Sequence, residues 1–468
     1  MILRAHNEMA RYRVAFVRQT YLYIFKSISL VITIFAAIMP AKQRRKLIYN
    51  FSSLGLIQVT NFLLSLLVIP FVIRRVGADG FGVIAVAQVV VFYLSVLTDY
   101  GFNQTATKDI ALYKNDKLKV SRIFFTVLAA KTLICILTFG LLIIFLLAVP
   151  VFYEHFNLYI LAFAFVLGQT LLISWFFQGI EKMQYMAITA LLSRLIFVTL
   201  VFVFIRSRGD ESLFLFFMGI GNMVGALVGI GIAFRIFKLK FAKPSWTDIK
   251  HEFKEGWQIT VTNLSMTTCQ YIGVFILRIF TNDLVVGYYS IAEKIYFAMK
   301  IMTGTFSQVI YPQVCQLVHA GRKQLILFFR QNYLPFLAVV IAGSAIVFIF
   351  SDQVLYFFIG YRHQQSSFIL RIMCVAAVIV CMNMPAYLVL LAANHKKSYL
   401  KIFTAGTVLN ITANIVLVQF LNAAGTVLSV IITELFITAG LWWEVYRLYS
   451  HAKNEGDNFL KSLFYESK

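Results

Sequence analysis

Charged residues are scarce in this chain, and their scarcity excludes most classes of soluble protein. Only 13% of its 468 residues are Asp, Glu, Lys or Arg, whereas 60% are hydrophobic. Soluble proteins carry roughly 25% charged residues. The segments between the long apolar runs are too short to hold a sizeable soluble domain. The composition therefore predicts a polytopic membrane protein.

Cysteine and histidine are also scarce, which argues against a metal site or a cofactor. The five cysteines lie in or beside apolar runs without metal-ligand spacing, and the seven histidines form no cluster in the sequence. The glycine pairs beginning at Gly219 and Gly229 follow no predicted strand, so they do not form a phosphate loop. We expect no enzyme activity, no metal and no cofactor beyond a coupling H⁺ or Na⁺.

Acidic residues number 20 against 42 Lys plus Arg, which gives a formal net charge of +22. Nucleic-acid binding is one explanation of this excess. However, the basic residues concentrate in alternate loops, as the positive-inside rule requires. With both termini in the cytoplasm, inside segments hold roughly thirty Lys plus Arg and outside loops about six. We therefore predict a bilayer partner, no nucleic acid, and cytoplasmic N- and C-termini.

About twelve apolar runs reach the length of about 20 residues that a membrane-spanning helix needs. They cover residues 51–73, 81–97, 123–149, 158–177, 186–205, 213–237, 259–279, 286–312, 333–350, 368–392, 402–421 and 425–446. We expect Pro385 to break the tenth helix. The runs predict an N-lobe of six helices over 47–237, a basic cytoplasmic linker over 238–255, a C-lobe of six helices over 256–447 and a cytoplasmic tail over 448–468.

Residues 1–46 form a basic extension with a short apolar segment, residues 27–41, that precedes the first span. At about 15 residues this segment is too short to cross a bilayer, and it lacks the small-residue pattern of a cleavage site. An interfacial helix fits it best. The alternative that Met39 is the true start stays open.

Polar residues recur at helical spacing on the two predicted helices between Gly256 and Pro312. They are Asn263, Thr267, Gln270 and Arg278 on the first, and Glu293, Lys300, Gly304 and Gln308 on the second. A charge at bilayer depth costs at least about 2.5–3.5 kcal/mol, so these stripes predict a polar cavity. Hydrogen bonding between packed helices is the alternative. The stripe Asn61, Ser65 and Arg75 in the first half is similar, which suggests the parallel repeat of an alternating-access transporter.

Several stretches resemble the Wzx-type polysaccharide flippases in the same order. They are residues 50–54 and 75–82, 97–102, 175–183 and 287–294, the last reading Gly-Tyr-Tyr-Ser-Ile-Ala-Glu-Lys. The resemblance implies the multidrug/oligosaccharidyl-lipid/polysaccharide (MOP) exporter superfamily, whose MATE-like all-α fold has about twelve transmembrane helices in two six-helix lobes. It implies a flippase of the bacterial inner membrane that moves an undecaprenyl-pyrophosphate-linked oligosaccharide repeat unit to the periplasmic leaflet. A polysaccharide polymerase and a chain-length regulator are the protein partners it suggests.

Such a substrate predicts three kinds of site residue. Cations would hold the pyrophosphate: Arg75, Arg278 and Lys300 first, then Arg194 and Lys131. Snorkelling at helix ends, or an ion pair for Lys300, is the alternative. Amides would hold the glycan: Asn61, Gln88, Asn263, Gln270, Gln308, Asn410 and Asn414. Carboxylates would carry a coupling ion: Glu434 first, then Asp99 and Glu293.

Other functions fit the sequence less well. A cation-coupled multidrug antiporter of the same superfamily predicts a more acidic cavity than the cations here suggest. A lipid II flippase is closer in chemistry, but such proteins typically have helices beyond the twelfth. A membrane glycosyltransferase or polymerase needs a large outside loop with catalytic carboxylates, and the longest outside loop, residues 351–367, offers only Asp352. A scaffold would not need aligned polar stripes.

Overall fold

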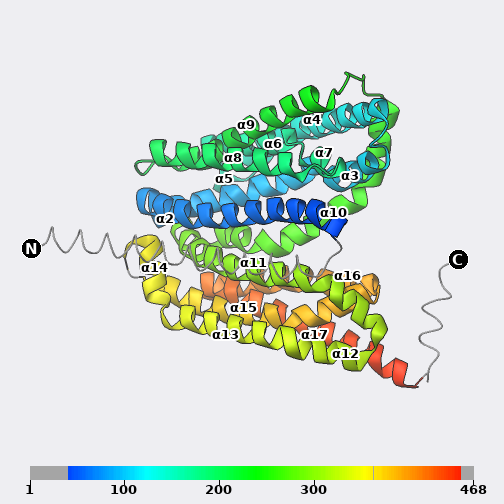
Figure 1. Ribbon diagram of the computed structural model, residues 1–468. Coiled ribbons are helices and arrows are strands. Elements are labelled where there is room, and N and C mark those ends of the chain that lie inside the picture. The colour runs from blue at the N-terminus through cyan, green and yellow to red at the C-terminus, as the bar shows by residue number, and fades with distance from the viewer. Residues whose placement is uncertain (1–40, 362, 455–468) are drawn as a thin grey trace, which may run out of the picture.

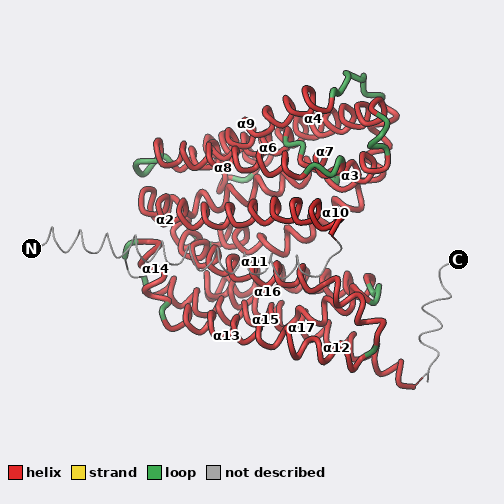
Figure 2. Tube along the Cα trace, in the orientation of Figure 1, coloured by secondary structure: helices red, strands yellow, loops and turns green. Residues whose placement is uncertain are grey.

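The computed structural model describes the backbone of residues 41–361 and 363–454. It describes side chains from Leu67 to Tyr449, except those at positions 319, 320, 322, 362 and 396. Within these residues the regular structure is helical throughout (Figure 2). The predicted interfacial helix, the side chain of Asn61 and the end of the tail lie outside the described residues.

The first six predicted spans are all helical. One long element, α2, holds two of them on either side of a kink at Gly77, where a φ of 86° suits a residue without Cβ. The elements are α2 (Ala41–Asp99), α3 (Phe102–Leu112), α4 (Lys117–Ala148), α5 (Pro150–Tyr153), α6 (Phe156–Leu171), α7 (Ser174–Gly179), α8 (Met183–Phe204) and α9 (Glu211–Phe237). The fourth predicted span is interrupted between α6 and α7, so it is less regular than its apolar run indicates.

The second six predicted spans are helical as well. The elements are α10 (Trp246–Phe280), α11 (Asp283–Ala320), α12 (Arg322–Phe328), η1 (Phe329–Tyr333), α13 (Leu334–Ile349), α14 (Ser351–Ile359), α15 (Gln364–Ala392), α16 (Lys396–Leu421) and α17 (Ala423–Asn454). Of these, η1 is a π-helical turn that joins α12 to α13, and α14 is a short helix between α13 and α15. Among the described residues, nine helical segments are long and apolar enough to cross a membrane by composition alone; α10 and α11 are too polar to qualify. The prediction of an all-α polytopic fold is confirmed.

The tenth helix is not broken at Pro385, contrary to the prediction. The helix α15 continues through this residue from Gln364 to Ala392. Proline lacks the N–H that would bond to the carbonyl four residues earlier, here that of Cys381. The Tyr333 hydroxyl donates to that carbonyl at 3.0 Å, from η1. The neighbouring helix thus satisfies the group that Pro385 leaves unpaired, and no break is needed.

The two lobes meet along α2 and α11 (Figure 1). Figure 1 shows the helices of the first half above this seam and those of the second half below it, apart from the start of α10, which reaches up toward α3. The two groups come together at the end that carries α14 and diverge toward the end that carries α3 and α12. By the predicted topology, the converging end is the outer, periplasmic end.

Glycine permits a close contact between the lobes near their outer ends. A Cβ at Gly82 would overlap the carbonyl oxygen of Asp283, and a Cβ at Gly287 would overlap the carbonyl oxygen of Ala78. We call these four residues the outer junction. Small residues let two helix backbones approach each other within a membrane. The outer junction therefore closes the seam at the outer end, and its two glycines come from stretches that carry the family resemblance.

Candidate functional site

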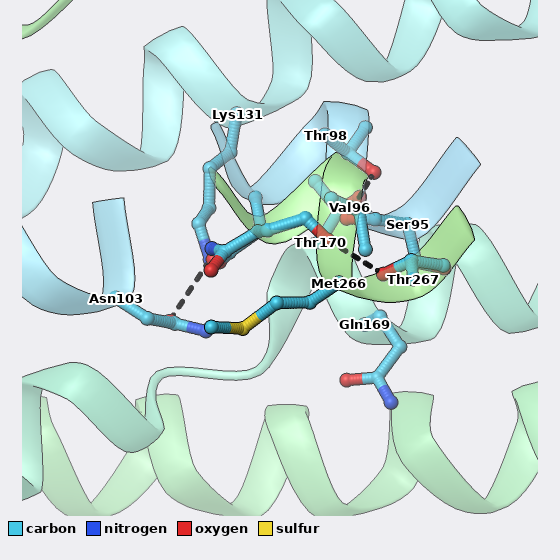
Figure 3. Close-up of a pocket in the computed structure, with 11 residues that line it drawn as sticks. Ser95, Val96, Thr98, Asn103, Lys131, Gln169, Thr170, Met266 and Thr267 are labelled. Atoms are coloured by element: carbon cyan, nitrogen blue, oxygen red, sulfur yellow. Dashed lines mark hydrogen bonds and ion pairs between the residues drawn. The ribbon is translucent and has the colours of Figure 1, made fainter. Parts of the chain in front are cut away.

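A polar cavity of about 330 Å³ lies between the lobes. Residues from five helices line it: Ser95, Val96, Thr98 and Asp99 from α2, Asn103 from α3, Lys131 from α4, Gln169 and Thr170 from α6, and Asn263, Met266 and Thr267 from α10 (Figure 3). We call it the central pocket. Its volume is within the range of about 300–1,000 Å³ typical of ligand sites. Both lobes contribute to it, as the site of an alternating-access transporter requires.

The charged centre of the central pocket is a pair formed by Lys131 and Asp99. The Lys131 ammonium lies 2.9 Å from Asp99 Oδ1 and donates to Asn103 Oδ1 at 3.3 Å. The Lys131 side chain is only 3% exposed, whereas that of Asp99 is 22% exposed. The sequence predicts that Lys131 binds an anion and that Asp99 carries a coupling ion. The structure joins them, so any anion that binds Lys131 competes with Asp99.

The predicted glycan amides are spread over several environments. Asn263 lines the central pocket, and Gln270 lines a second cavity within the C-lobe, described below. Gln308 is exposed on α11. Asn410 and Asn414 are buried where α16 packs against α17. Asn410 Nδ2 donates to Thr433 at 3.1 Å, and Asn414 accepts from Thr426 at 3.1 Å. The last two therefore stabilise a helix contact.

A second, smaller cavity of about 30 Å³ lies within the C-lobe and contains both predicted coupling carboxylates of that lobe. Its lining includes Glu293, Lys300, Asn410 and Glu434. Lys300 Nζ lies 3.5 Å from Glu434 Oε1, and Asn383 donates to the other carboxylate oxygen at 3.3 Å. Lys300 is thus one half of an ion pair, but its partner is Glu434 on α17 and not Glu293, the partner that its helical spacing suggests. We call this cavity the C-lobe pocket.

The predicted cations Arg75 and Arg278 lie at the outer ends of their helices. Arg75 is exposed, with its guanidinium 5.5 Å from the ring of Phe71. Arg278 is buried and contacts two carboxylates, at 2.7 Å to Asp283 and 3.2 Å to Glu154. Glu154 belongs to the first half of the chain, so this pair adds an ionic contact between the lobes. Both arginines are outside the central pocket in this conformation.

His155 extends that ionic contact at the outer surface. Its Nε2 lies 3.2 Å from Asp283, and the hydrogen bond to this carboxylate raises the pKa of His155. Glu154, His155 and Asp283 hold their ligand atoms within 4.8 Å of one another, a grouping that sequence spacing did not reveal. The guanidinium of Arg278 already contacts both carboxylates, so a divalent cation here would meet a fixed positive charge.

Arg194 and Lys294 are two further cations within predicted spans. Arg194 is partly buried on α8 and apart from both pockets. Lys294 was not among the predicted site residues, although it ends a stretch that carries the family resemblance. It donates to Gln88 Oε1 of the opposite lobe at 2.8 Å. Its position eleven residues inside α11, too deep to snorkel, is the signal that could have identified it.

The start of α10 packs against α3 on the side predicted to face the cytoplasm. A Cβ at Gly256 would overlap the carbonyl oxygen of Tyr100, so the two segments approach closely. Glu252, which precedes the predicted span, is 6% exposed there and accepts from Thr105 at 3.5 Å. Burial and then the nearby carboxylate of Asp109 raise the pKa of Glu252 to about 7. A carboxylate is therefore buried where the first and second halves of the chain meet on this side.

The pH dependence of stability should follow from Glu252. Its folded-state pKa lies above its ordinary value, so the folded state binds the proton more tightly. Glu252 therefore lowers stability progressively as the pH rises from about 4.5 to about 7, and the loss is complete above that. We expect Glu252→Gln to be up to about 3 kcal/mol more stable than the parent at pH 8 and equally stable near pH 4.5.

Unfolding of the purified protein in detergent at several pH values measures this effect. The exposed neighbour Glu255, whose charge contributes least to the raised pKa of Glu252, is the control when it is changed to Gln, and this change should shift the profile far less. A stability difference between Glu252→Gln and the parent that is the same at pH 4.5 and pH 8 would show that Glu252 does not titrate between them.

The sequence comparisons agree on one family. A model described as "Polysaccharide biosynthesis protein" matches residues 47–318, more than half of the chain. A protein of Escherichia coli K12 named "Putative O-antigen transporter" is 25% identical over 400 residues, which cover 85% of this chain and 95% of the relative. The "Probable low-salt glycan biosynthesis flippase Agl15" of Haloferax volcanii is 21% identical over 376 residues, 78% of this chain and 76% of the relative.

The fold is similar to those of solved transporters. An inward-facing multidrug resistance MATE family transporter of the MOP superfamily superposes with a TM-score of 0.62 at 16% identity, over 84% of this chain and all of that one. The lipid II flippase MurJ in an inward closed conformation superposes with a TM-score of 0.61 at 15% identity, over 84% of this chain and 87% of that one. These likenesses establish the fold. The family model and the named relatives show that the chain belongs to the polysaccharide biosynthesis protein family, as a Wzx-type flippase of the MOP superfamily.

Proposed function

We propose that this protein moves an undecaprenyl-pyrophosphate-linked oligosaccharide repeat unit from the cytoplasmic to the periplasmic leaflet of the bacterial inner membrane. The observation that carries the proposal is the buried Lys131 ammonium in a polar cavity between the lobes. A pyrophosphate cannot enter hydrocarbon without an opposite charge to offset its lost hydration. The hydroxyls and amides around Lys131 suit the glycan, while the polyprenyl tail stays in the lipid.

The conformation supports loading from the cytoplasm. The outer junction and the ionic contact of Arg278 with Glu154 hold the lobes together at the predicted periplasmic end. The central pocket lies farther in, close to the segment where the basic loop after Asp99 begins. With both termini in the cytoplasm, the pocket is nearer the leaflet in which the substrate is made. Alternating access then requires the outer junction to separate.

The C-lobe pocket is the proposed coupling site. Glu434 is 12% exposed beside Lys300, and uptake of H⁺ by its carboxylate would remove the attraction that holds the pair. Na⁺ could act instead by binding the carboxylate oxygens. Glu293 lines the same cavity. Asp99 in the central pocket is the second proposed carboxylate, because its charge decides how strongly Lys131 attracts a phosphate.

Deletion of the gene, followed by lipid extraction, tests the function. We expect an undecaprenyl-pyrophosphate-linked repeat unit to accumulate on the inner leaflet and to disappear when the chain is restored. The glycan is then identified from the extracted lipid. Accumulation of lipid II, or drug sensitivity with a normal lipid pool, would instead favour a lipid II flippase or a multidrug antiporter. Association with a polysaccharide polymerase or chain-length regulator can be tested in the same cells by crosslinking.

A further inference from the structure

Two partly exposed polar residues lie inside otherwise buried stretches of the seam between the lobes. Residues 80–87 of α2 and 286–293 of α11 are all buried, whereas Gln88 and Lys294, which follow them, are partly exposed. Lys294 Nζ donates to Gln88 Oε1 at 2.8 Å. The hydrogen bond thus joins the two lobes at a point within the seam where both of its side chains keep some exposure.

This hydrogen bond lies near the middle of the membrane. A rise of about 1.5 Å per residue places Lys294 about 16 Å from the outer end of α11, and Gln88 about as far from the kink at Gly77. The hydrocarbon core is about 30 Å thick, so neither side chain reaches the interface. Ser95 of the central pocket follows Gln88 by two turns of α2, about 10 Å closer to the cytoplasm. Gln88 and Lys294 therefore lie between the central pocket and the outer junction.

Lys294 has a different kind of partner from Lys131, Lys300 and Arg278. Lys131, Lys300 and Arg278 each contact a carboxylate within 4 Å. Among the described residues, Lys294 forms no such ion pair, and its acceptor is a neutral amide. The adjacent Glu293 projects from a different side of the helix. A carboxylate would hold the ammonium by charge attraction as well as by a hydrogen bond, whereas the amide of Gln88 carries no charge. An incoming anion can therefore replace the amide more readily than it could replace a carboxylate.

We propose that the substrate's diphosphate replaces Gln88 as the acceptor of Lys294, and that this exchange loosens the seam between the lobes. The inference rests on the proposed function. Before substrate binds, the hydrogen bond contributes to holding the lobes closed at the outer end. Once a phosphate oxygen binds Lys294, that contribution is lost and the outer junction opens more easily. Substrate binding would thus favour the conformational change that releases the substrate.

One substitution distinguishes the proposed role from that of a purely structural hydrogen bond. Gln88→Glu keeps the size of the side chain and turns the acceptor into a carboxylate. If the contact only stabilises the fold, an ion pair would serve it equally well and substrate binding would not change. In the proposed role, the carboxylate competes with the diphosphate for Lys294. Gln88→Leu removes the competing acceptor and should leave binding as tight as in the parent, or tighter.

Binding of undecaprenyl diphosphate to the purified full-length protein provides the test. We expect Lys294→Gln and Gln88→Glu each to weaken binding at least tenfold, and Lys294→Arg to stay within about threefold of the parent. The exposed cytoplasmic lysine Lys323, changed to Gln, is the control for a general loss of positive charge. The uncharged alcohol undecaprenol serves as the second probe, because its weaker binding should not distinguish the variants.

The outcomes separate the inference from the proposed function. Equal binding of undecaprenyl diphosphate by the parent, Lys294→Gln and Gln88→Glu overturns the inference and leaves the proposed function intact. A parent protein that binds undecaprenyl diphosphate no better than undecaprenol overturns both. If Lys294→Gln fails to fold, the comparison of Gln88→Glu with Gln88→Leu decides, because both keep Lys294 and the inference requires their affinities to differ at least tenfold.

Discussion

Replacing Gly287 by valine is expected to stop transport by preventing the outer ends of the lobes from meeting. Even a single Cβ at this position would overlap the carbonyl oxygen of Ala78, which belongs to the backbone of the opposite lobe and cannot rotate away. Overpacking typically costs about 1–3 kcal/mol in a well-packed core. A cost of about 3 kcal/mol confined to the closed conformation shifts the conformational equilibrium about 100-fold toward open outer ends. The transporter would then seldom present its pocket to the cytoplasm.

The accessibility of the central pocket can report this shift. In a protein without its five native cysteines, Ser95→Cys lies in the pocket wall and can be labelled by a membrane-impermeant maleimide. We expect labelling from the cytoplasmic side in the parent and from the periplasmic side once Gly287→Val is added. Gly82→Ala should act in the same direction.

Gly343 provides the matched control for this substitution. It lies within α13, and a Cβ there would meet no atom within 4 Å, so Gly343→Val should transport normally. Normal transport by Gly287→Val, with unchanged labelling, would mean that the outer ends do not need this contact to close.

The overall fold was predictable from the sequence because each span carries its own signal. Apolar runs of sufficient length and alternating basic loops determine where helices cross, and neither depends on which helices are neighbours. Pro385 is an exception. Whether a proline breaks a membrane helix depends on a partner for the unpaired carbonyl. That partner is Tyr333, about fifty residues away in the sequence.

The site was only partly predictable, because pairing is a property of the packed helices. The sequence marks Lys131 as a charge inside the third predicted span and Asp99 as one at the edge of the second, but nothing in it pairs a residue of α4 with one of α2. The glycines Gly82 and Gly287 belong to stretches of family resemblance, but only the structure shows that each lies against the other lobe. Lys294 was overlooked beside Glu293 and Lys300, since a helical stripe on one element cannot reveal a hydrogen bond to Gln88 on another.

Replacing Lys131 by glutamine is expected to abolish transport, and a second substitution separates binding from folding. Removing one partner of a buried ion pair costs about 3–5 kcal/mol, because the other charge is left uncompensated. The single variant should therefore lose stability as well as binding. Replacing both charges is often close to neutral for stability. The double variant Lys131→Gln, Asp99→Asn should regain most of the lost stability, measured by thermal unfolding in detergent.

Transport should not recover in that double variant if Lys131 binds the diphosphate. A hydrogen bond to a charged group contributes about 1.5–3 kcal/mol, so its loss weakens undecaprenyl diphosphate binding by about 10–150-fold. Recovery of both stability and transport would show instead that the pair only supports the fold. Asp99→Asn alone tests the competition between carboxylate and phosphate. It leaves Lys131 with amide partners only, so binding of undecaprenyl diphosphate should tighten while transport slows, because the substrate is then released less readily at the periplasmic side.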